Sequence, residues 1–169
     1  KSLMQKRIRK VLMICSSYDA YTLEEDGRIE VQIYKEYVDL NLSNPPTFTW
    51  VTSSAEAFVL LRDNLDFDLI ISMFNIGDMD VFRFSKLLKK EQPQIPFVLL
   101  THFSKELYKK IESADRSGID YIFSWHGNAD LILAIIKLFE DRMNADHDIL
   151  DVGVQSILLV EDSVRYYST

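Results

Sequence analysis

Short apolar runs alternate with amphipathic stretches along most of this chain, and this alternation is the feature that most constrains its fold. Five runs have the length and the branched or aromatic side chains of buried strands. We predict these strands at residues 11–14, 48–51, 68–74, 97–101 and 119–124. A polar, helix-compatible stretch follows Tyr18, and apolar residues at helical spacing predict further helices at residues 55–64, 81–91, 104–116 and 128–143.

Strands that are separated by helices pair in parallel, because parallel neighbours need crossover connections. The pattern therefore predicts an α/β protein with a doubly wound five-stranded parallel sheet and helices on both faces. In such sheets ligands bind outside the carboxyl ends of the strands. We expect any chemistry in the loops at residues 15–19, 73–80, 101–104 and 124–127.

Length and charge exclude several classes of function. The chain has 169 residues, enough for one domain with a sizeable core and an extension. Its net charge of −7 argues against binding to nucleic acid or to an anionic membrane surface. No apolar run approaches the ~20 residues that cross a bilayer. One cysteine cannot form an internal disulfide, so we expect a cytoplasmic protein.

One segment occurs twice, with different chemistry in each copy. Residues 10–17 and 156–163 are both short apolar runs followed by small polar residues. The second copy ends in the acidic pair Glu161 and Asp162, whereas Cys15 and Ser16 stand at those places in the first. Carboxylates bind hard divalent cations, and a neutral thiol and hydroxyl carry no charge for that purpose. The first copy therefore has the predicted strand without the metal-binding groups.

Three further segments carry a resemblance to a known family. They are Asp68 to Phe82 (DLIISMFNIGDMDVF), Ile95 to Thr101 (IPFVLLT) and Gly118 to Ser124 (GIDYIFS). They resemble the third strand and its loop, the fourth strand and the fifth strand of the receiver domain of bacterial two-component response regulators. The resemblance covers roughly residues 8–143. It implies a flavodoxin-like sheet with strand order 2-1-3-4-5.

The resemblance also implies where a phosphorylation site would lie. Receivers carry a phosphoacceptor aspartate at the end of the third strand and an acidic pair after the first strand, and these carboxylates together hold a divalent metal. A lysine after the fifth strand contacts the phosphoryl oxygens. These positions fall on Met73, on Cys15 and Ser16, and on Trp125, or on Ser124 if the alignment slips by one residue. A thioether forms no acyl phosphate. The resemblance therefore implies a degenerate receiver, a pseudo-receiver, that binds no metal or other cofactor and is not an enzyme.

Some polar groups remain near these positions. The switch hydroxyl of the family is retained as Thr101. Asp78 and Asp80 lie too far along the loop to replace the aspartate, and Asp19 is expected to cap a helix. A cysteine–histidine site at Cys15 and His102 is a further alternative, which we rank below a buried structural thiol.

Two regions depart from a minimal receiver. We expect residues 21–28 to form an extra turn or loop over the site, or else the helix to continue through Gly27. The last helix is apolar over more than the ~100° needed to pack on a sheet, which predicts contact with a protein partner or a second copy. The candidate contact residues on this and the preceding helix are Tyr108, Leu133, Ile136 and Met143.

These observations predict a pseudo-receiver at residues 1–143, a linker or helix extension at 144–155, and the truncated start of an adjacent receiver domain at 156–169. The predicted function is a non-phosphorylatable interaction, dimerisation or regulatory module in a multidomain bacterial signalling protein. One alternative is a small-ligand sensor that uses the vacated pocket. Another is a regulatory domain of a larger kinase or phosphoenolpyruvate/pyruvate-utilising enzyme.

Overall fold

A single parallel sheet organises the chain. The structure is a computed structural model that describes residues 6–25, 29–40, 42, 44–63, 66–102, 104–125, 127 and 129–146. The strands are β1 (Lys10–Ile14), β2 (Thr47–Val51), β3 (Leu69–Met73), β4 (Phe97–Thr101) and β5 (Tyr121–Ser124). They pair in parallel in the order β2-β1-β3-β4-β5, which confirms the predicted fold class and strand order. The predicted second domain at residues 156–169 lies outside the described residues.

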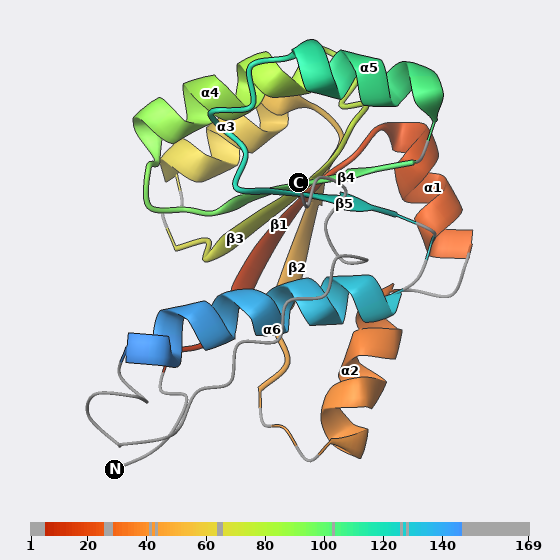
Figure 1. Cartoon of the computed structure of the whole chain (residues 1–169). Coiled ribbons are helices and arrows are strands. Elements are labelled where there is room, and N and C mark those ends of the chain that lie inside the picture. The colour runs from red at the N-terminus through yellow and green to blue at the C-terminus, as the bar shows by residue number, and fades with distance from the viewer. Residues whose placement is uncertain are drawn as a thin grey trace.

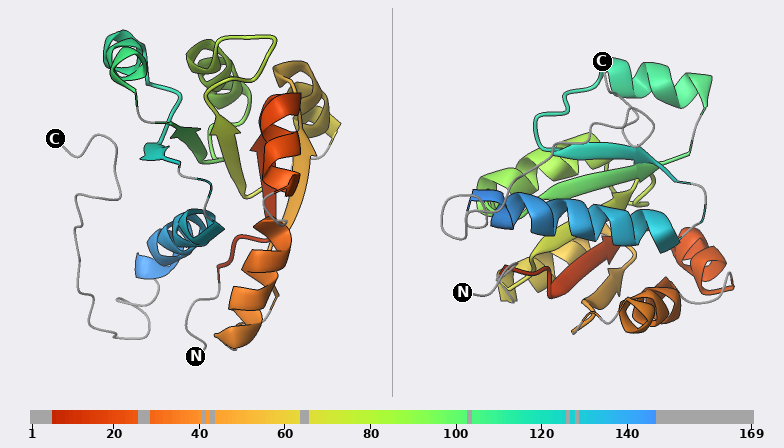
Figure 2. Two further views of the ribbon diagram at one scale, coloured as in Figure 1. Left: turned by 90° about the vertical axis from the view of Figure 1, so that its right-hand side faces the viewer. Right: turned by 60° about the horizontal axis from the view of Figure 1, so that its bottom comes forward.

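The helices form a layer on each face of the sheet. They are α1 (Ser17–Glu25), α2 (Ile29–Asp39), α3 (Ser54–Asp63), α4 (Val81–Glu91), α5 (Lys105–Ser113) and α6 (Ala129–Asp146). Helices α3, α4 and α5 cover one face, and α2 and α6 cover the other, where they pack against each other (Figures 1 and 2). This arrangement of three layers is the one expected when crossover helices cover a parallel sheet.

The strands are apolar because both of their faces are buried. Every residue of β3 and β4 is buried. Successive side chains of β1 alternate between the layers: Val11 and Met13 pack toward α2 and α6, and Leu12 and Ile14 toward α3 and α4. A strand that is half exposed would instead alternate apolar and polar residues. Continuous apolar runs in the sequence are therefore the signature of a sheet covered on both sides.

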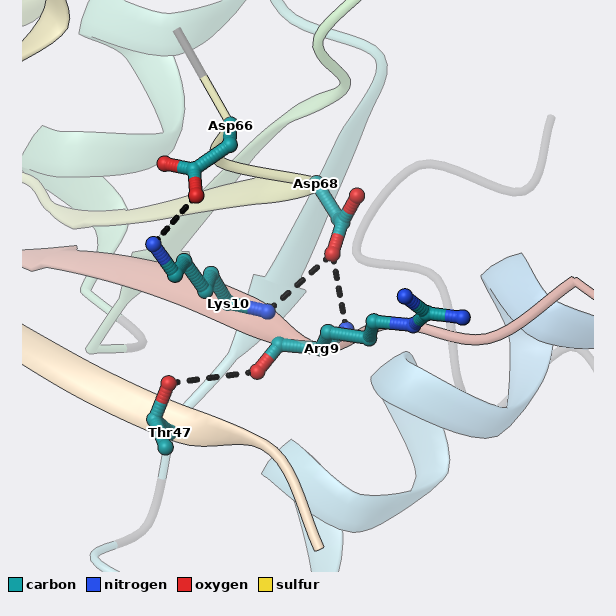
Figure 3. A network of polar contacts seen from close by, with 5 residues as sticks. All are labelled: Arg9, Lys10, Thr47, Asp66 and Asp68. Carbon is teal, nitrogen blue, oxygen red and sulfur yellow. Dashed lines mark hydrogen bonds and ion pairs between the residues drawn. The ribbon is translucent and has the colours of Figure 1, made fainter. Parts of the chain in front are cut away.

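A polar network holds β1 in place at the amino-terminal edge of the sheet (Figure 3). One carboxylate oxygen of Asp68 accepts hydrogen bonds from the backbone N–H groups of Arg9, at 2.7 Å, and Lys10, at 3.1 Å. The Lys10 ammonium pairs with Asp66, and the Thr47 hydroxyl donates to the Arg9 carbonyl. These contacts join the starts of β1, β2 and β3. They lie at the edge opposite to the strand ends where chemistry is expected.

Helix α6 is longer than predicted because its last turns bind the N-terminal segment. Buried Asn144 accepts from the backbone N–H of Lys6, at 2.8 Å, and donates to the carbonyl of the same residue, at 2.6 Å. Buried Glu140 accepts from the backbone N–H of Ile8 at 3.0 Å. Residues 144–146, which we assigned to a linker or helix extension, are helical. Residues 147–155 of that segment lie outside the described residues.

The segment after β1 differs from the prediction of an extra turn or loop at residues 21–28. Residues Ser17–Glu25 form the separate helix α1, and a second helix, α2, starts at Ile29. The described part of the predicted loop, residues 21–25, is thus helical. Among the described side chains of α1, Tyr21 is exposed to solvent and Ala20 packs against the core. The cause is local, because Ser16 and Asp19 form the capping interaction described below.

Helix α5 ends earlier than the predicted residue 116, and Gly118 lies in the turn that follows it. Helix α5 ends at Ser113, and the glycines with a left-handed backbone in the described chain are Gly77 and Gly127. A Cβ atom on Gly118 would lie 2.4 Å from the backbone carbon of Ser85 and 2.5 Å from the backbone nitrogen of Lys86. The turn before β5 therefore packs directly on the backbone of α4, and glycine is required by this close approach.

We predict that Gly118→Ala destabilises the fold by about 2 kcal/mol, because a methyl group has to displace helix backbone rather than a flexible side chain. Urea unfolding followed by circular dichroism measures the loss. Lys109→Ala, at an exposed position of α5, is the control and should change the free energy of unfolding by less than about 0.5 kcal/mol. Equal effects of the two substitutions would contradict the close contact.

Candidate functional site

The fold brings the predicted site residues to one edge of the sheet. Cys15 directly follows β1, Met73 ends β3, Thr101 ends β4 and Trp125 directly follows β5. The backbone N–H of Trp125 donates to the Thr101 carbonyl at 2.8 Å, and Cys15 N–H donates to the carbonyl of the last β2 residue at 3.1 Å. The strand register pairs Thr101 with Ser124. Both residues considered for the lysine position, Trp125 and Ser124, are therefore uncharged groups at this edge.

Three of these residues form part of one buried apolar cluster. Cys15 is 1% exposed, Met73 is 6% exposed and Trp125 is 2% exposed, and all three pack in the core layer between the sheet and α6. A receiver would place carboxylates and an ammonium group at these positions. Here the side chains offer a thiol, a thioether and an indole, and Mg²⁺ prefers oxygen ligands. The residues present do not fit the divalent cation that the fold family implies.

Cys15 is poorly suited to nucleophilic or redox chemistry. Burial, with a smaller contribution from the negative charge of Asp19, raises the pKa of its thiol to about 11. Because the thiolate is the reactive form, a raised pKa makes a cysteine inert at neutral pH. His102, the base considered for this site, is exposed, whereas Cys15 is buried. The structure assigns Cys15 to packing.

Ser16 caps the helix that follows the site and bonds to Asp19. The Ser16 hydroxyl accepts from the backbone N–H of Asp19 at 3.2 Å and donates to the Asp19 carboxylate at 2.9 Å. A hydroxyl at the start of a helix, bonded to the third residue along, is a typical N-cap arrangement. Asp19 lies in the first turn of this helix, as predicted, but the capping side chain is Ser16, and the Asp19 carboxylate accepts a hydrogen bond from that cap. This carboxylate stabilises the start of α1.

The two other nearby carboxylates also serve helix ends. Asp78 accepts from the backbone N–H groups of Ser54 and Ala55, at 2.8 and 3.2 Å, and from the Ser54 hydroxyl at 2.9 Å. Partial desolvation raises the pKa of Asp78, but these hydrogen bonds outweigh it and lower the pKa below its ordinary value. Asp80 is the N-cap of α4 and accepts from Arg83 N–H. Each carboxylate thus has a structural partner.

The retained hydroxyl of Thr101 is turned toward its own backbone. Thr101 is 2% exposed, and its hydroxyl donates to the carbonyl of His102 at 3.2 Å. In the described part of the chain, no group of three or more His, Cys, Asp and Glu side chains is placed to hold a metal ion. No described helix is long and apolar enough to cross a membrane. Glu161 and Asp162, the predicted acidic pair of the second domain, lie outside the described residues.

The predicted contact residues on the last two helices are less accessible than expected. Ile136 is fully buried in the core under α6, so we withdraw it as a surface contact. Leu133 and Met143 are half-buried and pack against the same core. Tyr108 on α5 is 37% exposed. The wide apolar surface of α6 is largely used inside the domain, because α2 packs against this helix as well as the sheet.

Exposed apolar residues gather instead on α1 and α2, which we did not predict. Helix α2 buries Ile29, Ile33 and Tyr37 toward α6. Its opposite side carries a second apolar set at helical spacing, and α1 adds two tyrosines. We call this set the α1–α2 surface: Tyr18, Tyr21, Val31, Tyr34 and Val38, which are all at least 55% exposed. The sequence signal was the excess of apolar residues in α2 over those that one buried stripe requires.

Known structures share this fold. No protein-family model and no curated protein matches the sequence. A response regulator receiver domain protein from Clostridium thermocellum is 15% identical, with a TM-score of 0.55 over 81% of this chain and 98% of that one. The phosphorylated cyanobacterial phytochrome response regulator RcpA is 20% identical, with a TM-score of 0.54 over 79% and 91%.

A third similar structure is described as a family of redox sensors in the streptococci that evolved from two-component response regulators. It is 18% identical, with a TM-score of 0.59, and the match covers 93% of this chain but 59% of that protein. Identities this low establish the fold and nothing further. The chain has the fold of a response-regulator receiver domain.

We predict that the Cys15 thiol resists labelling in the folded protein. With its pKa raised from 9.0 to about 11, the thiolate fraction at pH 8 falls about 100-fold, and burial blocks access as well. The rate of reaction with a disulfide reagent, measured by absorbance, should therefore fall at least 100-fold between the guanidinium-unfolded and the native protein. Similar labelling rates in the native and unfolded protein would contradict a buried, unreactive Cys15 thiol.

Proposed function

We propose that this chain is a receiver-like signalling module that accepts no phosphoryl group and acts through protein contacts. The observation that carries the proposal is the buried apolar cluster of Cys15, Met73 and Trp125 at the strand ends, where a receiver needs charged groups. Phosphotransfer to a receiver requires an oxygen nucleophile, a metal and a cation that neutralises phosphoryl charge. All three groups are missing together from these positions.

The surrounding carboxylates support the same proposal. The carboxylates of Asp78 and Asp80 each accept hydrogen bonds from backbone N–H groups at a helix start, and the Asp19 carboxylate accepts one from the Ser16 hydroxyl. Recruiting Asp78 or Asp80 as an acceptor would leave backbone N–H groups unsatisfied, at a cost of about 1 kcal/mol or more for each helix cap lost, and recruiting Asp19 would break its bond to the Ser16 hydroxyl. The structural use of these carboxylates therefore supports the proposal that the domain accepts no phosphoryl group.

The α1–α2 surface supports the part of the proposal that concerns contacts. Scattered exposed apolar residues are ordinary, but a set on adjacent helices rich in tyrosine is typical of a protein interface. Its α2 residues belong to a helix on the α6 side of the sheet (Figure 1). We therefore transfer the expected interface from α6 to α1 and α2, with a second copy of the chain as the proposed occupant.

The alternatives are less well supported. A small-ligand sensor at the vacated site would need open space at the strand ends, where Cys15, Met73, Thr101 and Trp125 are at most 6% exposed. A thiol-based redox sensor would need a reactive cysteine, and the single cysteine of this chain is buried with a raised pKa. The remaining alternative is a regulatory domain of a larger kinase or phosphoenolpyruvate/pyruvate-utilising enzyme, next to a receiver domain that starts at residue 156 and has Glu161 and Asp162 as its acidic pair.

We predict no phosphorylation when the 169-residue chain is incubated with acetyl phosphate and magnesium, because no carboxylate lies at the Met73 position. Intact-mass spectrometry measures the adduct directly. A competent receiver treated in parallel supplies the positive control and should show a stoichiometric phosphoryl mass. A stoichiometric adduct on the described domain, located by peptide mapping, would disprove the proposal.

We predict that the chain self-associates through the α1–α2 surface. Light scattering between about 10 and 200 μM should show a weight-average mass that rises above the 19.7 kDa of one chain. Tyr34→Asp combined with Val38→Asp should return the mass to that of a monomer, because buried charges oppose an apolar interface. Val59→Asp on α3, at an equally exposed position, is the matched control and should leave association unchanged. A wild-type chain that is monomeric throughout contradicts self-association.

A further inference from the structure

A groove between α4 and α5 is the feature of the molecule that the proposed function does not use. It lies on the face of the sheet opposite to α2 and α6, and its volume is about 570 Å³. Phe82, Phe74, Leu87 and Ala114 provide its apolar lining, and the rings of Phe74 and Phe82 pack edge to face with centroids 6.0 Å apart. The groove is open, because most of its polar lining residues are exposed.

The two helices are held apart by contacts that fix the groove. Helix α4 buries five residues against the sheet, whereas Ile111 is the one buried residue of α5. The turn after α5 packs through Gly118 on the backbone of α4. In the same region, Lys86 of α4 pairs with Asp115 at 2.6 Å. Helix α4, one wall of the groove, is therefore part of the core. Helix α5, the other wall, is joined to α4 by the contacts of Asp115 and Gly118, which follow its last residue.

Its charge is opposite to that of the chain as a whole. Arg83, Lys86 and Lys90 recur on α4 at a spacing of one and two turns, and Lys110 faces them from α5. The two acids of the groove, Asp80 and Asp115, are already bonded to a helix N-terminus and to Lys86. Among the described residues, Arg83, Lys90 and Lys110 have no ion-pair partner, in a chain with a net charge of −7.

The shape of this charge indicates the class of ligand. Arg83 and Lys90 are seven residues apart, which places them about 10 Å apart along the helix. A single phosphate or a small organic anion would engage one end of this row, and in so open a groove it would stay largely in water. Nucleic acid would be repelled by the acidic remainder of the chain. A peptide with acidic side chains at one-turn spacing and apolar side chains between them complements both the row and the apolar lining.

We propose that the α4–α5 groove binds an acidic amphipathic segment of a partner protein. Carboxylates of the segment pair with Arg83, Lys90 and Lys110, and its apolar side chains cover Phe82 and Leu87. The inference deepens the proposed function, because it names a partner chemistry for a module that acts by contact. Its test is independent of phosphotransfer and of the α1–α2 surface.

The test is a selection followed by a binding measurement. A random 12-residue peptide library displayed on phage is selected on the full chain and, in parallel, on Arg83→Glu/Lys90→Glu. Peptides enriched on the wild type should be acidic and carry apolar residues three or four positions apart. The most enriched peptide, synthesised with a fluorophore, should bind in fluorescence polarisation and lose at least tenfold in affinity with the groove variant. Raising sodium chloride from 50 to 300 mM should weaken binding at least tenfold.

Lys105→Glu/Lys109→Glu is the matched control, because it changes the net charge equally at exposed positions of α5 that do not line the groove. This variant should keep the affinity within twofold, and circular dichroism should show that both variants remain folded. Three results would each overturn the proposal: enrichment without an acidic bias, equal binding to the groove variant, or equally tight binding of polyglutamate, which lacks apolar side chains. A stoichiometric phosphoryl adduct in the mass experiment would disprove the proposed function but would not change the outcome of the peptide-binding test.

Discussion

The parallel pairing of β1 with both β2 and β3 is the constraint on which the rest of the structure depends. A central strand can bury both of its faces only if helices cover both sides of the sheet, and its crossover connections then determine where those helices lie. The same pairing carries the first strand end to the edge where β3, β4 and β5 also end. Asp68 reinforces it at the opposite edge through two backbone hydrogen bonds. The position of the candidate site is thus a consequence of the sheet and does not require the site to keep its chemistry.

Sequence patterns predicted the sheet well because its signals are local. The predicted bounds of β4 and α4 match the structure at both ends, since Pro96 precedes one element and the Asp80 cap starts the other. The errors lie where distant residues decide the outcome. Helix α6 continues to Asp146 because Asn144 binds Lys6, and Gly118 is required by the backbone of α4 rather than by the end of α5. Neither contact leaves a periodic signal in the sequence.

The same distinction applies to the functional residues. Comparison of strand ends was enough to predict which positions would form the site, because each follows a recognisable strand. The sequence comparison could not show that Met73 and Trp125 pack in one buried cluster, nor that the Ile136 side chain is buried in the core. The basic row on α4 was visible as a spacing of three and seven residues. That this row lines a groove could not be predicted, because Lys110 and Ala114 lie opposite to it only through the packing of α5.

An apolar cluster at the strand ends limits how a domain of this fold can be regulated. Closely spaced carboxylates repel one another, and a receiver uses a metal and a phosphoryl group to alter that balance. Cys15, Met73 and Trp125 have no comparable charge to alter, and the Thr101 hydroxyl already bonds to a neighbouring carbonyl. A binding partner can shift a conformational equilibrium only through its different affinities for the two states. In this chain, a shift between conformations would therefore depend on partners that bind the surface. Helix α2 and the α4–α5 groove lie on opposite faces of the sheet, so a partner bound to α2 would leave the groove accessible, which is the geometry that a scaffold between two partners requires.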